Sequence, residues 1–168
     1  MIKNINFLFV TFFGIGTVRY APGTITSLIT TILLFSFFYI LNLSNLTVLI
    51  ILIAIFIYAF LAVANYIKDG TNKDPKEVVI DEVIGQSIPI YLYQVAHGTS
   101  KDFNEAILFY FYIFILFRFF DIKKPFPVNF IDRKFKNSFG VIMDDVIAGF
   151  YVVLTLIIFM VVKSKILT

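Results

Sequence analysis

Residues 20–67, YAPGTITSLITTILLFSFFYILNLSNLTVLIILIAIFIYAFLAVANYI, contain no Asp, Glu, Lys, Arg or His over 48 consecutive positions. A helix needs about 20 apolar residues to cross the hydrocarbon core of a bilayer, so this run can supply two membrane spans. We expect them at about 25–41 and 46–67. The connection between them is so short that the two helices must form an antiparallel hairpin.

The composition of the whole chain supports the same class. Of its 168 residues, 60% are hydrophobic and 22 are Phe, and the mean hydropathy is +0.92. These values lie outside the usual range for soluble domains. The length is that of one domain, so residues 1–168 are expected to form a single membrane-embedded domain. The absence of Cys excludes disulfides, thiolate catalysis and cysteine metal sites.

Three further helices are expected after the hairpin, at about 78–96, 103–120 and 141–162. The first begins with Asp81 and Glu82 and contains Pro89, so we expect it to be short, kinked and packed against protein rather than lipid. The apolar run at 5–15 is not followed by an A-x-A-like cleavage site, and it is interpreted as an interfacial helix rather than a signal peptide. The predicted fold is all-α, a multi-pass helical membrane protein with about four to five membrane-embedded helices plus an N-terminal interfacial helix.

Basic residues gather on one side of this topology. With the N-terminus inside and five crossings, 11 of the 14 Lys and Arg residues fall on one face, and only Lys101, Lys163 and Lys165 fall on the other. Cytoplasmic loops carry the excess of basic residues, so the crowded face is expected to be cytoplasmic. The same rule accounts for the formal charge of +3 without a nucleic acid partner.

Two acidic pairs lie near the cytoplasmic starts of helices, namely Asp81 with Glu82 and Asp144 with Asp145. Each pair is followed within about one turn by a glycine, at Gly85 and Gly149, which lets helices approach closely. Close carboxylates repel one another unless a cation neutralises them, and carboxylate oxygens are the ligands that Mg²⁺ prefers. The alternative is that these acids only complement the helix macrodipole.

Acids and bases are mixed in the stretch from 118 to 136, beside apolar segments where charges are costly. A metal together with a phosphate would account for both signs, although Arg118 and Lys124 also suit an anchoring role at the lipid headgroups. Earlier in the chain, GIGTVRYAPGTITSL at 14–28 offers hydroxyl groups at the start of a helix. It is interpreted either as a phosphate-contacting loop or as a plain helix entry with Thr24 as N-cap.

The sequence lacks residue types that several phosphatase mechanisms require. Without Cys there is no phosphocysteine route, and His97 is the only histidine, so the paired histidines of the type 2 phosphatidic acid phosphatases are absent. No D-x-D-x-[TV] motif occurs for a mechanism of the haloacid dehalogenase kind. What remains is attack of a metal-activated water on phosphorus, with a carboxylate as base and Arg or Lys stabilising the developing charge. Attack on phosphorus by one of the paired aspartates, in place of water, is the alternative mechanism.

Five motifs occur in order along residues 14–149: APGT with Ser27, VIDE with Gly85, RFFDI followed by Lys124-Pro125 and Pro127, Asp132-Arg133, and GVIMDD through Ala148-Gly149. With this ordered set the sequence resembles the phosphatidylglycerophosphatase A family. It departs from the family pattern at Thr26, where Gly is usual, and at 137–139, which is less Gly-rich.

The resemblance implies an Mg²⁺-dependent phosphatase in the bacterial inner membrane that converts phosphatidylglycerophosphate to phosphatidylglycerol, with its active site facing the cytoplasm. It implies that the catalytic acids are Asp81, Glu82, Asp144 and Asp145. The metal ligands would be Asp81, Glu82, Asp121, Asp144 and Asp145. The contacts to the substrate phosphate would be Thr24, Ser27, Arg118, Lys124 and Arg133.

The residues leave two other functions to compare with this one. A small transporter of cations or metabolites would use the acidic cluster as its binding site, but transport acids are expected near the middle of the bilayer. A CDP-alcohol phosphatidyltransferase would need a D-G-x₂-A-R…G…D…D pattern, which the sequence lacks.

Overall fold

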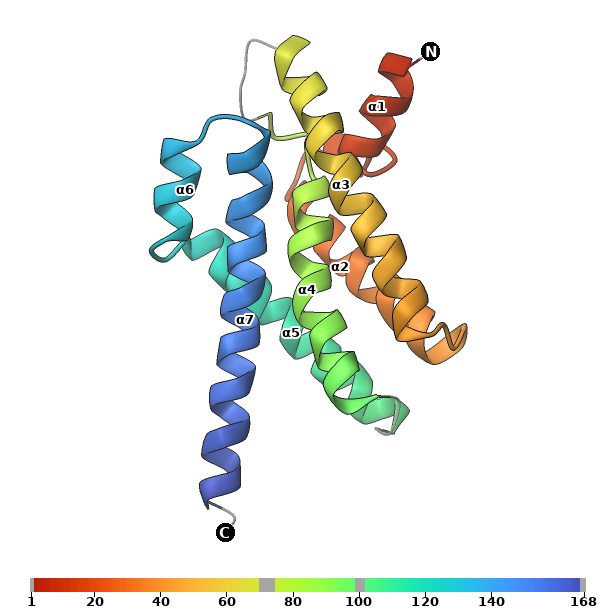
Figure 1. Cartoon of the computed structure of the whole chain (residues 1–168), viewed down its shortest axis with the longest axis vertical. Coiled ribbons are helices and arrows are strands. Elements are labelled where there is room, and N and C mark those ends of the chain that lie inside the picture. The colour runs from red at the N-terminus through yellow and green to blue at the C-terminus, as the bar shows by residue number, and fades with distance from the viewer. Residues whose placement is uncertain (1, 70–74, 99–101, 167–168) are drawn as a thin grey trace.

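The computed structural model describes residues 2–69, 75–98 and 102–166, and nearly all of them are helical. The elements in chain order are α1 (Ile2–Val10), η1 (Ile15–Thr17), α2 (Pro22–Phe35), η2 (Ser36–Ile40), α3 (Asn45–Asp69), α4 (Ile80–His97), α5 (Phe103–Lys123), α6 (Val128–Lys134) and α7 (Ser138–Ile166). No strand occurs within these described ranges, which confirms the all-α prediction. Figure 1 shows the helices side by side, with both α1 and the start of α7 at the same end of the molecule.

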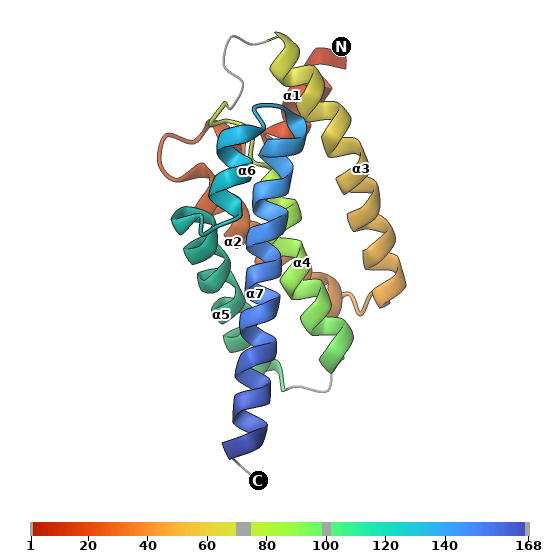
Figure 2. The ribbon, with the colours of Figure 1, turned by 60° about the vertical axis from the view of Figure 1, so that its left-hand side comes forward.

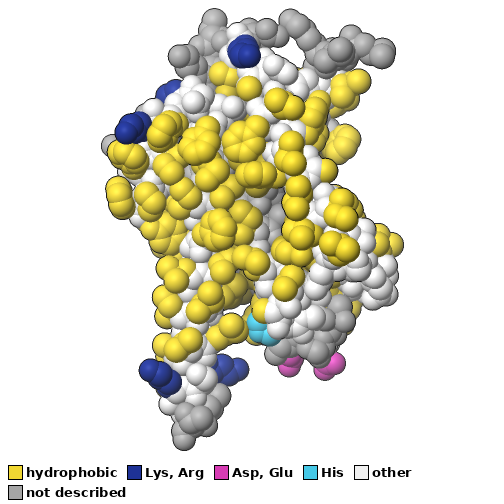
Figure 3. Space-filling model, viewed as in Figure 1, with side chains coloured by type: hydrophobic (Ala, Val, Ile, Leu, Met, Phe, Trp, Pro, Cys, Tyr) yellow, Lys and Arg dark blue, Asp and Glu magenta, His cyan; other side chains and the backbone are white. Residues whose placement is uncertain are grey.

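Three helical segments are long and apolar enough to cross a membrane: Pro22–Ile40, Asn45–Lys68 and Ser138–Ile166. Along α3, side chains at three- and four-residue intervals are about half exposed, at Ile50, Ile53, Ile57 and Leu61. Such a stripe is suited to contact with lipid. Figure 3 shows hydrophobic side chains covering this face of the molecule, with basic side chains towards its two ends.

The predicted hairpin is present, because η2 ends at Ile40 and α3 begins at Asn45. Ser44 caps α3 by accepting a hydrogen bond from the Thr47 N–H at 3.1 Å. Helix α1 has nine residues and is about 14 Å long, far short of the hydrocarbon thickness. Helix α1, which contains much of the first apolar run, is therefore too short to cross a membrane.

Helix α4 lies at the centre and contacts α2, α3, α5 and α7. Its closest approach is to α7, where Gly85 faces Gly149. A Cβ atom added at Gly149 would lie 2.5 Å from the carbonyl oxygen of Gly85. Pro89 has no N–H to bond that same carbonyl, four residues earlier in α4, so the oxygen is available to the facing glycine. The close approach predicted from the two glycines is confirmed.

Two apolar clusters hold the helices together on either side of α4. One joins α4 to α1, α3 and α7, and the other joins it to α2, η2, α3, α5 and α7. Figures 1 and 2 show that α2, α4 and α7 begin, and α5 ends, towards the same end of the bundle. The helix ends that carry the predicted site residues are thereby brought together.

Candidate active site

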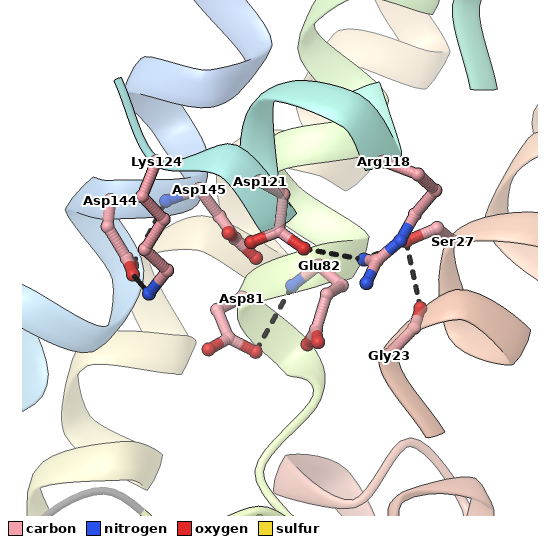
Figure 4. A network of polar contacts seen from close by, with 9 residues as sticks. All are labelled: Gly23, Ser27, Asp81, Glu82, Arg118, Asp121, Lys124, Asp144 and Asp145. Carbon is pink, nitrogen blue, oxygen red and sulfur yellow. Dashed lines mark hydrogen bonds and ion pairs between the residues drawn. The ribbon is translucent and has the colours of Figure 1, made fainter. Parts of the chain in front are cut away.

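Four chain segments far apart in the sequence meet at this end of the bundle. They are the start of α2, the start of α4, the end of α5 and the second turn of α7. Figure 4 shows the polar side chains that they bring together. These include all five predicted metal ligands and, among the predicted phosphate contacts, Ser27, Arg118 and Lys124.

Three carboxylates form the centre of the cluster. Asp81, Glu82 and Asp145 each offer one oxygen atom, and these atoms all lie within 4.8 Å of one another. Asp145 is buried, whereas the two α4 acids are partly buried. Among the described residues, nothing donates a hydrogen bond to Glu82 Oε2, which is a buried atom. Burial raises the pKa of Asp81, and the neighbouring Glu82 carboxylate raises it further, so the cluster favours a positive charge nearby.

The other two predicted metal ligands lie in ion pairs. Asp121 Oδ2 is 2.8 Å from Arg118 Nη1, and Asp144 Oδ2 is 2.7 Å from Lys124 Nζ. Asp144 also accepts a hydrogen bond from the Asp145 N–H at 3.0 Å. The five predicted acids therefore divide into a close group of three and two that flank it with basic partners.

A pocket of about 430 Å³ opens onto this cluster. Its floor includes the three grouped carboxylates, and its walls include Thr24, Arg118 and Lys124. Sequence reasoning missed two basic residues at its rim, Lys76 and Lys136. Both lie in short segments just before helices, where only the folded chain shows which way the residues face.

The start of α2 forms another wall of the pocket. The helix begins at Pro22, with Ala21 as an N-cap residue that makes no side-chain cap hydrogen bond, so the alternative of Thr24 as N-cap is wrong. A Cβ atom at Gly23 would collide with the carboxylate of Glu82, so a larger residue here would displace that carboxylate. The uncapped backbone N–H groups at a helix start can bind an anion.

Ser27, one of the predicted phosphate contacts, does not line the pocket. Ser27 is fully buried behind Arg118, and its Oγ accepts a hydrogen bond from Arg118 Nη1 at 3.2 Å. It also donates to the Gly23 carbonyl at 2.9 Å, so it fixes Arg118 to α2 from the side away from the pocket. Arg133 belongs to α6, and its side chain lies outside the described part of the structure.

The cluster lies within a region of the chain that matches a known family. A family model described as phosphatidylglycerophosphatase A matches residues 8–160, which covers the whole cluster. The chain belongs to the phosphatidylglycerophosphatase A family. It is 34% identical over 143 residues to a protein of that name from Haemophilus influenzae, covering 84% of this chain and 80% of the relative.

Two further relatives of this chain also have the names of lipid phosphatases. The phosphatidylglycerophosphatase A of Escherichia coli is 29% identical over 139 residues, covering 82% of this chain and 73% of the relative. A Bacteroides thetaiotaomicron protein, named as a candidate phosphatidylinositol-3-phosphatase, is 34% identical over 140 residues and 83% of each chain. No solved structure matches the chain.

Membership of the phosphatidylglycerophosphatase A family makes this chain a phosphatase, and its apolar helices make it a membrane protein. The transporter alternative is not favoured by these relatives. The specific resemblance predicted from the ordered motifs is confirmed.

Proposed function

We propose that this protein is an Mg²⁺-dependent lipid phosphatase that hydrolyses phosphatidylglycerophosphate to phosphatidylglycerol and inorganic phosphate in phospholipid biosynthesis. The observation that carries the proposal is the group of three carboxylates, with Arg118 and Lys124 beside it, at the floor of one pocket. A phosphate monoester needs both kinds of group: a cation site and fixed positive charge. The names of two relatives supply the lipid.

The chemistry of the donor set fits Mg²⁺. All three candidate ligands are carboxylates, which suit a hard cation, and no His or Cys accompanies them in the group. The buried Glu82 Oε2 has no hydrogen-bond donor among the described residues, as expected of an atom whose charge is balanced by a cation. Asp81, Glu82 and Asp145 would hold the ion, while Asp121 and Asp144 hold the flanking basic residues.

The phosphate group would be held from two sides. Arg118 is fixed by Asp121 and by Ser27, and a guanidinium group has five N–H donors, so these contacts leave others for phosphoryl oxygens. Lys124 adds a point charge, and the start of α2 adds Thr24 with its backbone N–H groups. An anion bound here would lie between the grouped carboxylates and these donors.

The reaction transfers a phosphoryl group to water. The oxygen of water bonds to phosphorus as the bond from phosphorus to the glycerol oxygen breaks, and a carboxylate of the cluster accepts the proton that the water loses. That proton then goes to the departing glycerol oxygen, which gives the alcohol of phosphatidylglycerol. Mg²⁺, when bound, supplies charge neutralisation at the phosphoryl group. Arg118 and Lys124 stabilise the negative charge that develops on its oxygens.

The placement of the pocket suits a lipid substrate in the bacterial inner membrane. The pocket lies at the end of the bundle that includes the basic residues from 118 to 136, which is cytoplasmic by the positive-inside rule. A lipid anchored by acyl chains presents its phosphate at the interface, level with helix ends rather than helix centres. The active site would therefore face the cytoplasm.

Phosphate release by the detergent-purified protein tests this proposal. Phosphatidylglycerophosphate is supplied with Mg²⁺ and then with EDTA, and phosphatidic acid and phosphatidylinositol 3-phosphate are supplied as competing lipids. We expect metal-dependent release that is selective for phosphatidylglycerophosphate. Selective release from phosphatidylinositol 3-phosphate would instead assign the specificity suggested by the Bacteroides relative. No release from any of the three lipids, by protein shown to be folded, would overturn the proposal.

A further inference from the structure

In the turns that follow the acidic cluster, α2 and α4 carry buried side-chain polar atoms that have no hydrogen-bond partner among the residues described. They are both amide atoms of Gln86 and the hydroxyl groups of Thr26 and Thr30. Gln86 and Thr26 are fully buried and Thr30 is nearly so. Buried polar groups are nearly always paired, so an unpaired set beside a reaction centre needs a physical explanation.

The hydroxyl groups are easily satisfied within their own helices. Ser27, Thr31 and Ser87 show how, because each donates to the carbonyl four residues earlier, at 2.9, 2.8 and 2.6 Å. Thr26 and Thr30 can do the same by rotating one bond. The side chain of Gln86 carries an acceptor and two donors at the end of a longer chain. It is the one polar group of this set that requires an outside partner.

The sequence places Gln86 one turn beyond Glu82 on α4, so the two side chains share a face of the helix. Gln86 is fully buried, and Glu82 is partly buried with its Oε2 atom inaccessible to solvent. Gly23 lies against the Glu82 carboxylate, and α2 and α4 run in the same direction from that contact. Gln86 is therefore about level with the turn of α2 that follows Gly23 and holds Thr26. An unpaired amide donor and an unpaired carboxylate oxygen, Glu82 Oε2, thus lie one turn apart.

We propose that Gln86 is a positioning residue for Glu82. Its amide N–H₂ donates a hydrogen bond to Glu82 Oε2 when the carboxylate cluster binds its cation, and this contact fixes the orientation in which Glu82 meets the ion. The inference rests on the proposed metal site. Groups that orient a metal ligand typically change metal affinity by 10- to 100-fold when they are removed.

The chain offers a matched control for this role. Gln94 is also buried in α4, but its Oε1 accepts a hydrogen bond from the Tyr110 hydroxyl at 3.1 Å. Replacing Gln94 by Met breaks a hydrogen bond that is already formed, whereas replacing Gln86 by Met removes a polar group that has no hydrogen-bond partner among the described residues. The two substitutions make the same change in side-chain shape and polarity. We nevertheless expect them to differ in their effects on both the melting temperature and the Mn²⁺ affinity.

The experiment measures Mn²⁺ binding by electron paramagnetic resonance of the free ion, and thermal unfolding in EDTA, both on detergent-purified protein without lipid. For Gln86→Met we expect a melting temperature equal to or above that of the wild type, and Mn²⁺ affinity weaker by about tenfold. For Gln94→Met we expect a lower melting temperature and unchanged Mn²⁺ affinity.

Two results would overturn the role of Gln86: unchanged Mn²⁺ affinity in Gln86→Met, or a fall in its melting temperature as large as that of Gln94→Met. A wild-type protein that binds no Mn²⁺ would overturn the proposed metal site, and the role of Gln86 with it. Mn²⁺ binding that is normal in both variants would leave the metal site standing and refute only the positioning role.

Discussion

The glycine contact between α4 and α7 makes the strongest test of the site, because it separates the geometry of the acids from their chemistry. Gly149→Ala changes none of the acidic residues themselves. Its new Cβ atom would lie 2.5 Å from the carbonyl oxygen of Gly85, whereas ordinary contact begins at 3.4 Å, so the two helices must separate by about 0.9 Å. The obstacle is backbone and cannot rotate away.

That separation acts directly on the candidate metal group, because α4 carries Asp81 and Glu82 while α7 carries Asp145. A misplacement of about 1 Å in a reaction centre can lower the rate about 100-fold, and overpacking typically costs about 1–3 kcal/mol of stability. We expect Gly149→Ala to lose phosphate release by about two orders of magnitude while the protein still inserts and remains folded.

The assay compares Mg²⁺-dependent phosphate release and the melting temperature in detergent for Gly149→Ala, the wild type and Leu154→Ala. Leu154 is on the same helix but is 51% exposed on its outer surface, so its truncation should leave activity unchanged. Near-normal turnover by Gly149→Ala would refute the idea that the helix crossing sets the position of the acids.

Three further predictions concern the polar groups. Asp81→Asn and Asp145→Asn should each abolish phosphate release while the proteins still fold, and near-normal rates in both would contradict the metal assignment. Arg118→Lys should lower kcat/KM at least tenfold, since a lysine cannot reproduce the guanidinium contacts to Asp121 and Ser27; an unchanged value would remove Arg118 from substrate binding. EDTA should stop turnover and added Mg²⁺ should restore it, and activity that persists through chelation would rule out a metal-dependent mechanism.

Much of the fold follows from the sequence, because its strongest signals are lengths and periods. The uncharged run from 20 to 67 has the length of two membrane spans, and the structure confirms the hairpin that they were predicted to form. Gly85 and Gly149 also revealed a helix contact, since small residues are needed wherever backbones approach closely. Helix α6 was missed because its seven residues, 128–134, are too few to show a helical period.

The division of the acids could not be read from the chain. Arg118 and Asp121 are three residues apart on α5, so their ion pair is a local one. Asp144 looks like Asp145 in the sequence, and only the folded structure shows that Asp144 pairs with Lys124 on another segment. Ion pairs between distant segments depend on tertiary packing and leave no local pattern. Gln86 was missed for the same reason, because an unpaired buried amide is recognisable only when its neighbours are known.

All three grouped carboxylates are supplied by two helices that touch at a pair of glycines, and none is supplied by a loop. The connecting segments can therefore be lengthened, shortened or replaced without moving these three carboxylates. The same property makes the α4–α7 pair a starting point for engineering: chimaeras that exchange loops between distant relatives should keep the acids in register as long as both glycines are retained.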